Sequence, residues 1–206
     1  MQHDDANAMS HPTIYYMRHG ETAWSLSGQH TGKTDLALTG NGEEQARQLR
    51  RSLRDINFGH VFTSPRQRAR HTCELAGLGQ IATTEPDLAE WDYGDYEGIL
   101  TVDIRRQRPD WSILRDGCPH GEMPGDVVHR ADRLIARLRT LKGNIALFSH
   151  GQFGQVFVAR WIGWPVIEGR HFVLDPASVS ILGYKQDSSA LPVIRQWNSS
   201  ENCVRT

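Results

Sequence analysis

The segment NIALFSHG at 144–151 constrains the fold more than any other, because its residues 145–148 are apolar without alternation. A strand with one face in water alternates apolar and polar side chains. A central strand of a parallel sheet is covered by helices on both faces and has no such alternation. We therefore predict that 144–151 is a central strand of an α/β protein.

The rest of the chain alternates short apolar segments with longer amphipathic ones, as helix-covered parallel sheets require. We predict strands at 13–18, 60–64, 81–85, 144–151, 178–184 and 191–197. Helices are expected from Thr39 as N-cap to Ile56, from Ser64-Pro65 to about Ala76, over 126–141 and over 151–163. The expected fold is a three-layer α/β/α sandwich with a mostly parallel central sheet. It forms one domain over 13–206, preceded by a disordered tail at 1–12.

Composition narrows the possible partners. The 206 residues suit one sizeable domain, and the net charge of −1 gives no reason to expect nucleic acid or an anionic membrane. Any affinity for an anion must therefore be local. The three cysteines form no CxxC pair and are odd in number, which favours a reducing compartment, the cytoplasm. No run approaches the ~20 apolar residues of a membrane span, and no HExxH or HxH pattern predicts a metal site.

Two of the predicted strands have similar endings. The first runs into Arg18-His19-Gly20, and the strand at 144–151 ends in Ser149-His150-Gly151. If these strands are neighbours, two histidines meet at the carboxyl edge of the sheet, where open α/β sheets bind ligands. The helix that starts near Gly151 would add N–H donors, and nearby arginines would match phosphate oxygens. An isolated histidine or a charged helix face is more often structural, so only the joint placement suggests a phosphoryl site.

Four segments carry a resemblance to the histidine phosphatase superfamily, which includes the cofactor-dependent phosphoglycerate mutases. They are RHGET at 18–22, TSPRQRARHT at 63–72, LAEWDYGDYEG at 88–98 and FSHG at 148–151, in the family's order and spacing. The segments SLSGQHTGKTDLALT, DYGDYEG and WSILRDGC look most like the sedoheptulose-bisphosphatase-like branch of sugar-phosphate phosphatases. The resemblance implies a phosphoglycerate mutase-like fold and an enzyme that needs neither cofactor nor metal.

The resemblance also assigns the central roles. His19 would be the nucleophile that forms a phosphohistidine, with Arg18, Arg68 and His150 holding the transferred phosphoryl group. Arg68 is chosen over Arg66 and Arg70 because the family's arginine directly precedes a small residue, here Ala69. A neutral imidazole is a good nucleophile, and neighbouring guanidinium groups would keep its pKa low.

Proton transfer and substrate contacts follow from the same resemblance. Glu90 would act as general acid for the leaving group and then as base for the hydrolytic water. Asp92, Asp95 and Glu97 are rivals in the same segment. The expected substrate-contacting residues are Ser25, Thr31, Gly32, Tyr93, Arg115, Gly151 and Gln152.

Three functions compete at this point. The favoured one is a phosphatase of a small phosphate ester, a sugar phosphate or bisphosphate, for which Arg115 and, less well, Lys33 are candidate cations for a second phosphate. A phosphoglycerate mutase is the alternative, but such mutases carry two consecutive arginines where this chain has Arg115-Asp116. A non-catalytic phospho-ligand binding module is the third, although all four core groups, His19, Arg68, Glu90 and His150, are present. The oligomeric state is not predicted.

Overall fold

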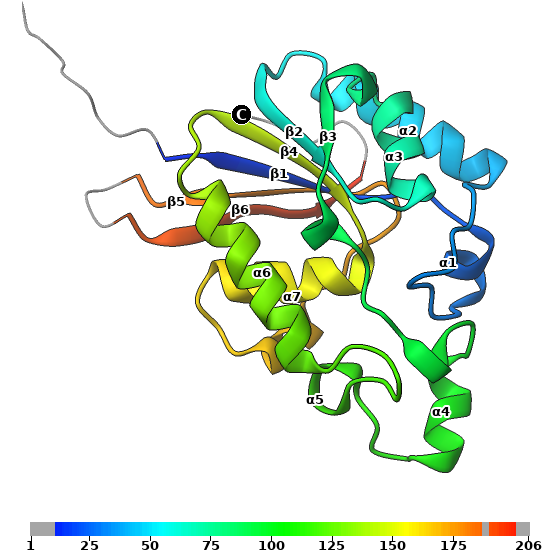
Figure 1. Ribbon diagram of the computed structural model, residues 1–206. Helices are drawn as coiled ribbons and strands as arrows, with labels where there is room; N and C mark the ends of the chain where they lie inside the picture. Colours follow the sequence, from blue (N-terminus) through cyan, green and yellow to red (C-terminus); the bar gives the residue numbers. More distant parts are fainter. Residues whose placement is uncertain (1–10, 187–189, 201–206) are drawn as a thin grey trace, which may run out of the picture.

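The computed structural model describes residues 11–186 and 190–200, so residues 1–10 of the predicted tail lie outside the described residues. Six strands form one sheet in the order β3-β2-β4-β1-β5-β6 (Figure 1). The strands are β1 (Thr13–Arg18), β2 (Phe58–Thr63), β3 (Ala82–Thr84), β4 (Asn144–Ser149), β5 (Val179–Tyr184) and β6 (Pro192–Ser199). All six predicted strands are present, with ends that differ by at most a few residues.

The sheet is mostly parallel, as predicted. β1, β2, β3 and β4 run in one direction, whereas β5 pairs antiparallel with both β1 and β6. The register between β1 and β4 places Arg18 opposite Ser149. The residues that follow, His19 and His150, therefore leave the sheet side by side at its carboxyl edge.

Helices cover both faces of the sheet and form the three layers that were expected (Figure 1). The helices α2 (Gly40–Leu53) and α3 (Gln67–Leu75) lie on one face, and α6 (Pro124–Leu138) and α7 (Gly151–Trp161) lie on the other. In β1, Ile14 and Tyr16 belong to the core under α6 and α7, while Tyr15 and Met17 belong to the core under α2 and α3. Both faces are therefore dry, which explains why the central strands show no polar alternation.

Several short elements were not predicted. They are the helices α1 (Ala23–Ser27), α4 (Thr101–Gln107) and α5 (Ile113–Asp116), and the 3₁₀ segments η1 (Gly79–Ile81), η2 (Pro86–Leu88), η3 (Gly94–Tyr96) and η4 (Val166–His171). They lie in loops that connect the main elements, and their few turns give too little periodicity to detect in a sequence. Among the residues that the structure describes, no helix is long and apolar enough to cross a membrane.

The start of α3 differs from the prediction. The sequence pattern placed it at Ser64-Pro65, but the helix begins at Gln67, with Arg66 as an N-cap that has no side-chain hydrogen bond. The Ser64 hydroxyl instead lies 2.7 Å from Nε2 of His150 and accepts the backbone N–H of Arg66 at 3.3 Å. A serine that resembles a helix cap in the sequence is thus a neighbour of the histidine pair.

Candidate active site

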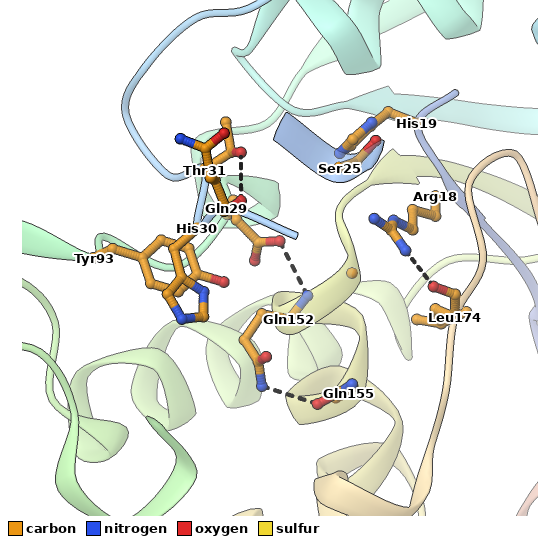
Figure 2. Close-up of a pocket in the computed structure, with 12 residues that line it drawn as sticks. Arg18, His19, Ser25, Gln29, His30, Thr31, Tyr93, Gln152, Gln155 and Leu174 are labelled. Atoms are coloured by element: carbon orange, nitrogen blue, oxygen red, sulfur yellow. Dashed lines mark hydrogen bonds between the residues drawn. The ribbon is translucent and has the colours of Figure 1, made fainter. Parts of the chain in front are cut away.

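A cavity of about 180 Å³ lies where β1 and β4 end (Figure 2). It is lined by Arg18, His19, Ser25, Gln29, His30, Thr31, Glu90, Tyr93, Gly151, Gln152, Gln155 and Leu174. Most of the predicted site residues are in this set. Arg68 and His150 are fully buried and do not line the cavity, although the ring of His150 contacts that of His19. Arg18, His19, Arg68 and His150 are called the basic end below.

His19 follows the last residue of β1 and is only 5% exposed. Its Nδ1 lies 2.7 Å from the carbonyl oxygen of Gly20, so Nδ1 must carry the hydrogen and Nε2 holds the lone pair. Burial, together with the charges of Arg68 and Arg18, lowers the pKa of His19 well below its usual value of 6.5. The ring is therefore neutral near pH 7, which is the form in which imidazole is a nucleophile.

His150 follows β4, and the two imidazole rings meet edge to face with centroids 5.2 Å apart. Its Nε2 is paired with the Ser64 hydroxyl at 2.7 Å, whereas its buried Nδ1 has no partner among the described residues. Burial first, and then the neighbouring Arg68, lower its pKa well below 6.5. The structure thus brings the two predicted histidines together as neutral rings.

Glycines follow both histidines, and packing requires the first and leaves little room for a side chain at the second. A Cβ on Gly20 would lie 2.3 Å from the carbonyl oxygen of Gly42 in α2. A Cβ on Gly151 would lie 3.3 Å from the guanidinium carbon of Arg18. The glycines therefore allow the backbone to approach the protein itself, where the sequence analysis expected a close approach to a ligand.

Arg68 lies in the first turn of α3 and is 0% exposed. Its terminal nitrogens donate to the carbonyl oxygens of Thr34 at 3.0 Å, Thr31 at 3.0 Å and Gly32 at 3.1 Å. Its Nε is buried and has no partner among the described residues. The guanidinium therefore fixes the loop at 31–34 and keeps its Nε–H donor unused.

Arg18 is the last residue of β1. One terminal nitrogen donates to the carbonyl oxygen of Leu174, and Nε is buried without a partner in the described part of the chain (Figure 2). Burial lowers the pKa of Arg18, but an arginine remains cationic near neutrality. The basic end thus holds two guanidinium groups, each with an unpaired N–H that an anion could accept.

Glu90 caps the N-terminus of α7. Its Oε1 accepts the backbone N–H groups of Phe153 at 2.7 Å and Trp91 at 2.9 Å, and its Oε2 accepts that of Gln152 at 3.0 Å. The sequence analysis expected N–H groups of this helix to bind an anionic ligand, but those of Gln152 and Phe153 are taken by the carboxylate. The carboxylate is consequently held at a fixed place in the cavity wall.

The rivals of Glu90 lie elsewhere. Asp92 pairs with Lys33 at 2.6 Å, and Asp95 pairs with His120. Glu97 accepts the backbone N–H groups of Gly32 and Thr34. Of the four acidic residues in 90–97, all of which the structure describes, only Glu90 lines the cavity.

Across the cavity from Arg18 and His19 lies a wall of which the sequence analysis had assigned only Tyr93 and Gln152 to substrate contact (Figure 2). It is formed by Gln29, His30, Tyr93, Gln152 and Gln155, and is called the amide wall below. His30 stacks on Tyr93 with centroids 4.5 Å apart, and burial lowers its pKa to about 4. Gln152 donates its amide to Gln155 at 2.9 Å. At neutral pH this wall therefore presents uncharged hydrogen-bonding groups.

One available signal could have indicated part of this wall. Gln155 follows Gln152 by three residues in α7, and side chains at that spacing share a helix face. Gln29 and His30 belong to the loop segment that resembled the sugar-phosphate branch, but no contact was assigned to them. Leu174, the remaining unpredicted lining residue, belongs to the loop before β5 and carries no sequence signal.

Two predicted substrate residues are not in the cavity lining. Arg115 lies in α5, where it pairs with Asp116 at 2.9 Å and donates to the carbonyl oxygen of Asp110. Gly32 is held between Glu97 and Arg68 through its own backbone. Lys33, the other candidate cation, is engaged by Asp92. The described residues contain no group of three or more His, Cys, Asp or Glu side chains that could hold a metal ion.

Comparison with known proteins gives a consistent picture. The profile of the histidine phosphatase superfamily (branch 1) matches residues 14–199. An acid phosphatase of Mycobacterium tuberculosis is 41% identical over 185 residues, which cover 88% of this chain and 91% of that protein. The sedoheptulose 1,7-bisphosphatase of Saccharomyces cerevisiae is 38% identical over 186 residues, covering 74% of this chain and 68% of that protein.

A solved structure supports the same relationship. The product of a Mycobacterium tuberculosis open reading frame superimposes with a TM-score of 0.85 and 36% identity. The superposition covers 91% of this chain and 97% of that chain. The predicted phosphoglycerate mutase-like fold is thereby confirmed.

Proposed function

This chain belongs to the histidine phosphatase superfamily (branch 1), and from that premise we propose that it hydrolyses a small phosphorylated metabolite through a phosphohistidine intermediate. The observation that carries the proposal is the meeting of two neutral imidazoles with two guanidinium groups at one sheet edge. The phosphatases among its relatives support hydrolysis of phosphate esters.

In the proposed first step, the Nε2 lone pair of His19 attacks phosphorus. The N–P bond forms while the P–O bond to the alcohol breaks, and the leaving oxygen takes a proton from the carboxyl group of Glu90. The unpaired Nε–H groups of Arg18 and Arg68 support this step, because they can donate to the phosphoryl oxygens in the transition state.

In the second step, water attacks the phosphohistidine. The carboxylate of Glu90 takes a proton from this water, the new O–P bond forms, and the N–P bond breaks to release phosphate and neutral His19. The position of Glu90 in the cavity wall, fixed as a carboxylate by three backbone N–H groups, supports its use as the base in this step.

We propose a sugar phosphate as substrate. The amide wall supports a polyhydroxylated leaving group, because neutral amides and an imidazole can donate to and accept from hydroxyl groups. The yeast relative is a bisphosphatase, so a sugar bisphosphate belongs to the same proposal. No role in a second phosphate site is proposed for Arg115, whose guanidinium is held by Asp116 outside the cavity.

The phosphoglycerate mutase alternative gains no support from this arrangement. Apart from the arginine of the basic end, no lysine or arginine is among the residues that line the cavity, so none is placed to hold the substrate carboxylate of a mutase. A non-catalytic binding module is also less well supported, since a nucleophile and an acid both line the cavity. The cytoplasm remains the proposed compartment, supported by the free thiols of Cys73 and Cys118.

A substrate panel tests the proposal. The purified protein is incubated with sugar monophosphates, with sedoheptulose and fructose bisphosphates, and with 3-phosphoglycerate and its bisphosphate, and released phosphate is measured. We expect phosphate release from one or more sugar phosphates and acid-labile labelling of the protein by a radioactive substrate. Isomer interconversion without phosphate release would favour the mutase, and absence of turnover on every ester would favour a binding module.

A further inference from the structure

We propose that Ser64 is a positioning residue, which holds the proton of His150 on Nδ1 and so directs that N–H to the transferred phosphoryl group. The inference rests on the proposed function for its phosphoryl group, but the proton position is a property of the protein alone. Ser64 acts through His150 and touches no reacting atom in this proposal.

The first step concerns the partners of the Ser64 hydroxyl. Ser64 follows the last residue of β2 and is 0% exposed. Its Oγ accepts the backbone N–H of Arg66 at 3.3 Å and lies 2.7 Å from Nε2 of His150. A hydroxyl has a single hydrogen, and among the described residues His150 Nε2 is the one group placed to accept it.

The second step follows from the cost of a buried unpaired donor. If Nε2 carried the proton, it would donate to Ser64, and the serine hydrogen would have no acceptor in the described part of the chain. If Nε2 holds the lone pair, the serine donates to it and both groups are satisfied. A buried unpaired polar group is unfavourable, so the neutral ring is held with its proton on Nδ1.

The third step concerns the other side of the ring. Nδ1 of His150 is buried without a partner among the described residues, and the ring contacts that of His19, the proposed nucleophile. With the proton on Nδ1, the ring offers a donor to a phosphoryl oxygen. With the proton on Nε2, the ring would present a lone pair to that oxygen, which is repulsive.

The proton position on each of the two histidine rings is thus fixed by a different kind of hydrogen-bond partner. His19 donates its Nδ1–H to the backbone carbonyl of Gly20, which no side-chain substitution removes. His150 depends on a hydroxyl 86 positions earlier in the chain. A change at Ser64 should therefore alter the proton position of His150 while leaving that of His19 unchanged.

Nitrogen NMR of the imidazole rings tests the inference directly. In ¹⁵N-labelled protein the two ring nitrogens of a neutral histidine have separate shifts that show which one carries the proton. The His150 signals are assigned by their loss in a His150→Gln variant. We expect a lone pair on Nε2 in the native protein, and in Ser64→Ala a proton that moves to Nε2 or is shared between both nitrogens.

Kinetics provide the second measurement. In Ser64→Ala we expect kcat to fall by on the order of tenfold with a smaller change in KM. The reason is that His150 would less often hold its proton on Nδ1, and so would less often donate to the charged phosphoryl oxygen in the transition state. Ser64→Thr keeps the hydroxyl and should retain the native proton position and most of the activity. Ser180→Ala is the matched control, since Ser180 is also fully buried and its hydroxyl also accepts a backbone N–H, that of Asn198.

The outcomes separate this inference from the proposed function. A native His150 with its proton on Nε2, or unchanged His150 shifts in folded Ser64→Ala, overturns the role of Ser64 whatever the activity. An equal loss of kcat in Ser180→Ala would also overturn it, because the effect would then be structural. If the native protein shows the expected proton position but hydrolyses no ester, the proposed function fails and the positioning by Ser64 stands.

Discussion

Arg18 and His19 of the basic end face the same cavity as the amide wall, but the two regions are built in different ways. The histidines and Arg18 of the basic end stand at the ends of β1 and β4, where the strand register fixes their positions. The amide wall consists of side chains from α7 and from loops, which are held partly by one another, as His30 stacks on Tyr93, and partly by other loop groups, as Gln29 donates to the carbonyl oxygen of Gly98. Under the proposed function, the chemistry would depend on the sheet, while the choice of leaving group would depend on elements that can vary without changing the sheet.

The largest expected effect tests the basic end at its proposed nucleophile. His19→Ala removes the nitrogen that forms the bond to phosphorus, so turnover should fall by more than about a thousandfold and labelling by a radioactive substrate should cease. The fold should persist, as measured by circular dichroism. His129→Ala, at an exposed position in α6, is the matched control. Retained turnover in His19→Ala would remove this residue from the mechanism.

The next effect concerns Glu90, the proposed acid in the cavity wall. Glu90→Gln cannot transfer a proton, so sugar phosphates should be hydrolysed about a hundredfold more slowly. p-Nitrophenyl phosphate should be affected less, since its leaving group needs no proton. Asp92→Asn, a carboxylate of the same segment outside the cavity, should change neither rate appreciably. An equal loss on both esters would argue against an acid role for Glu90.

A third prediction compares the regions through their histidines. His19 and His150 at the basic end and His30 in the amide wall all have pKa values below 6.5 in the folded protein, that of His30 being about 4. Between these values and 6.5 the unfolded chain binds protons that the folded protein does not. The contribution of these three histidines to the free energy of unfolding is therefore fully present above pH 6.5. It is lost as the pH falls below 6.5, because protons then bind to the unfolded chain.

His30→Gln measures the share of the amide wall in this dependence. Between pH 6 and pH 5 the free energy of unfolding should fall less steeply in the variant, by up to about 1.4 kcal/mol per pH unit, because one proton uptake is removed. Urea denaturation at several pH values gives the slope, with His129→Ala as control. Identical slopes in His30→Gln and the native protein would show that His30 is not kept neutral by the fold.

The smallest expected effect belongs to the amide wall alone. Gln155→Ala removes one neutral hydrogen-bonding group, so KM for a sugar phosphate should rise by about two- to tenfold. The inhibition constant of inorganic phosphate should not change, since phosphate has no leaving group to contact this wall. Gln107→Ala, at an exposed position of α4, is the control. Equal weakening of inorganic phosphate would erase the distinction between the two regions.

The sheet was predictable because each of its strands and covering helices has a local pattern of apolar residues. The uninterrupted apolar residues of β4 required two covered faces, and the helical spacing in α2 and α6 identified the covering layers. The similar endings of the two strands predicted that His19 and His150 meet if the strands are neighbours, and the strand order of the sheet makes them neighbours. The contact of Ser64 with His150 joins positions 86 residues apart, so no local pattern contains it and the serine was taken for a helix cap. Three members of the amide wall, Gln29, His30 and Gln155, were missed for a related reason, since the loops and the helix that carry them meet only in the folded protein.

Arg68 donates three hydrogen bonds to backbone carbonyl oxygens, and this second role complicates the reading of any substitution there. Its guanidinium is at once a proposed ligand of the phosphoryl group and the tie that holds residues 31–34 in place. Any shorter or neutral side chain would release that stretch, including Thr31 at the cavity, together with the charge. The kinetic constants of an Arg68 variant would therefore combine a lost cation with a rearranged surface, and one number could not separate the two.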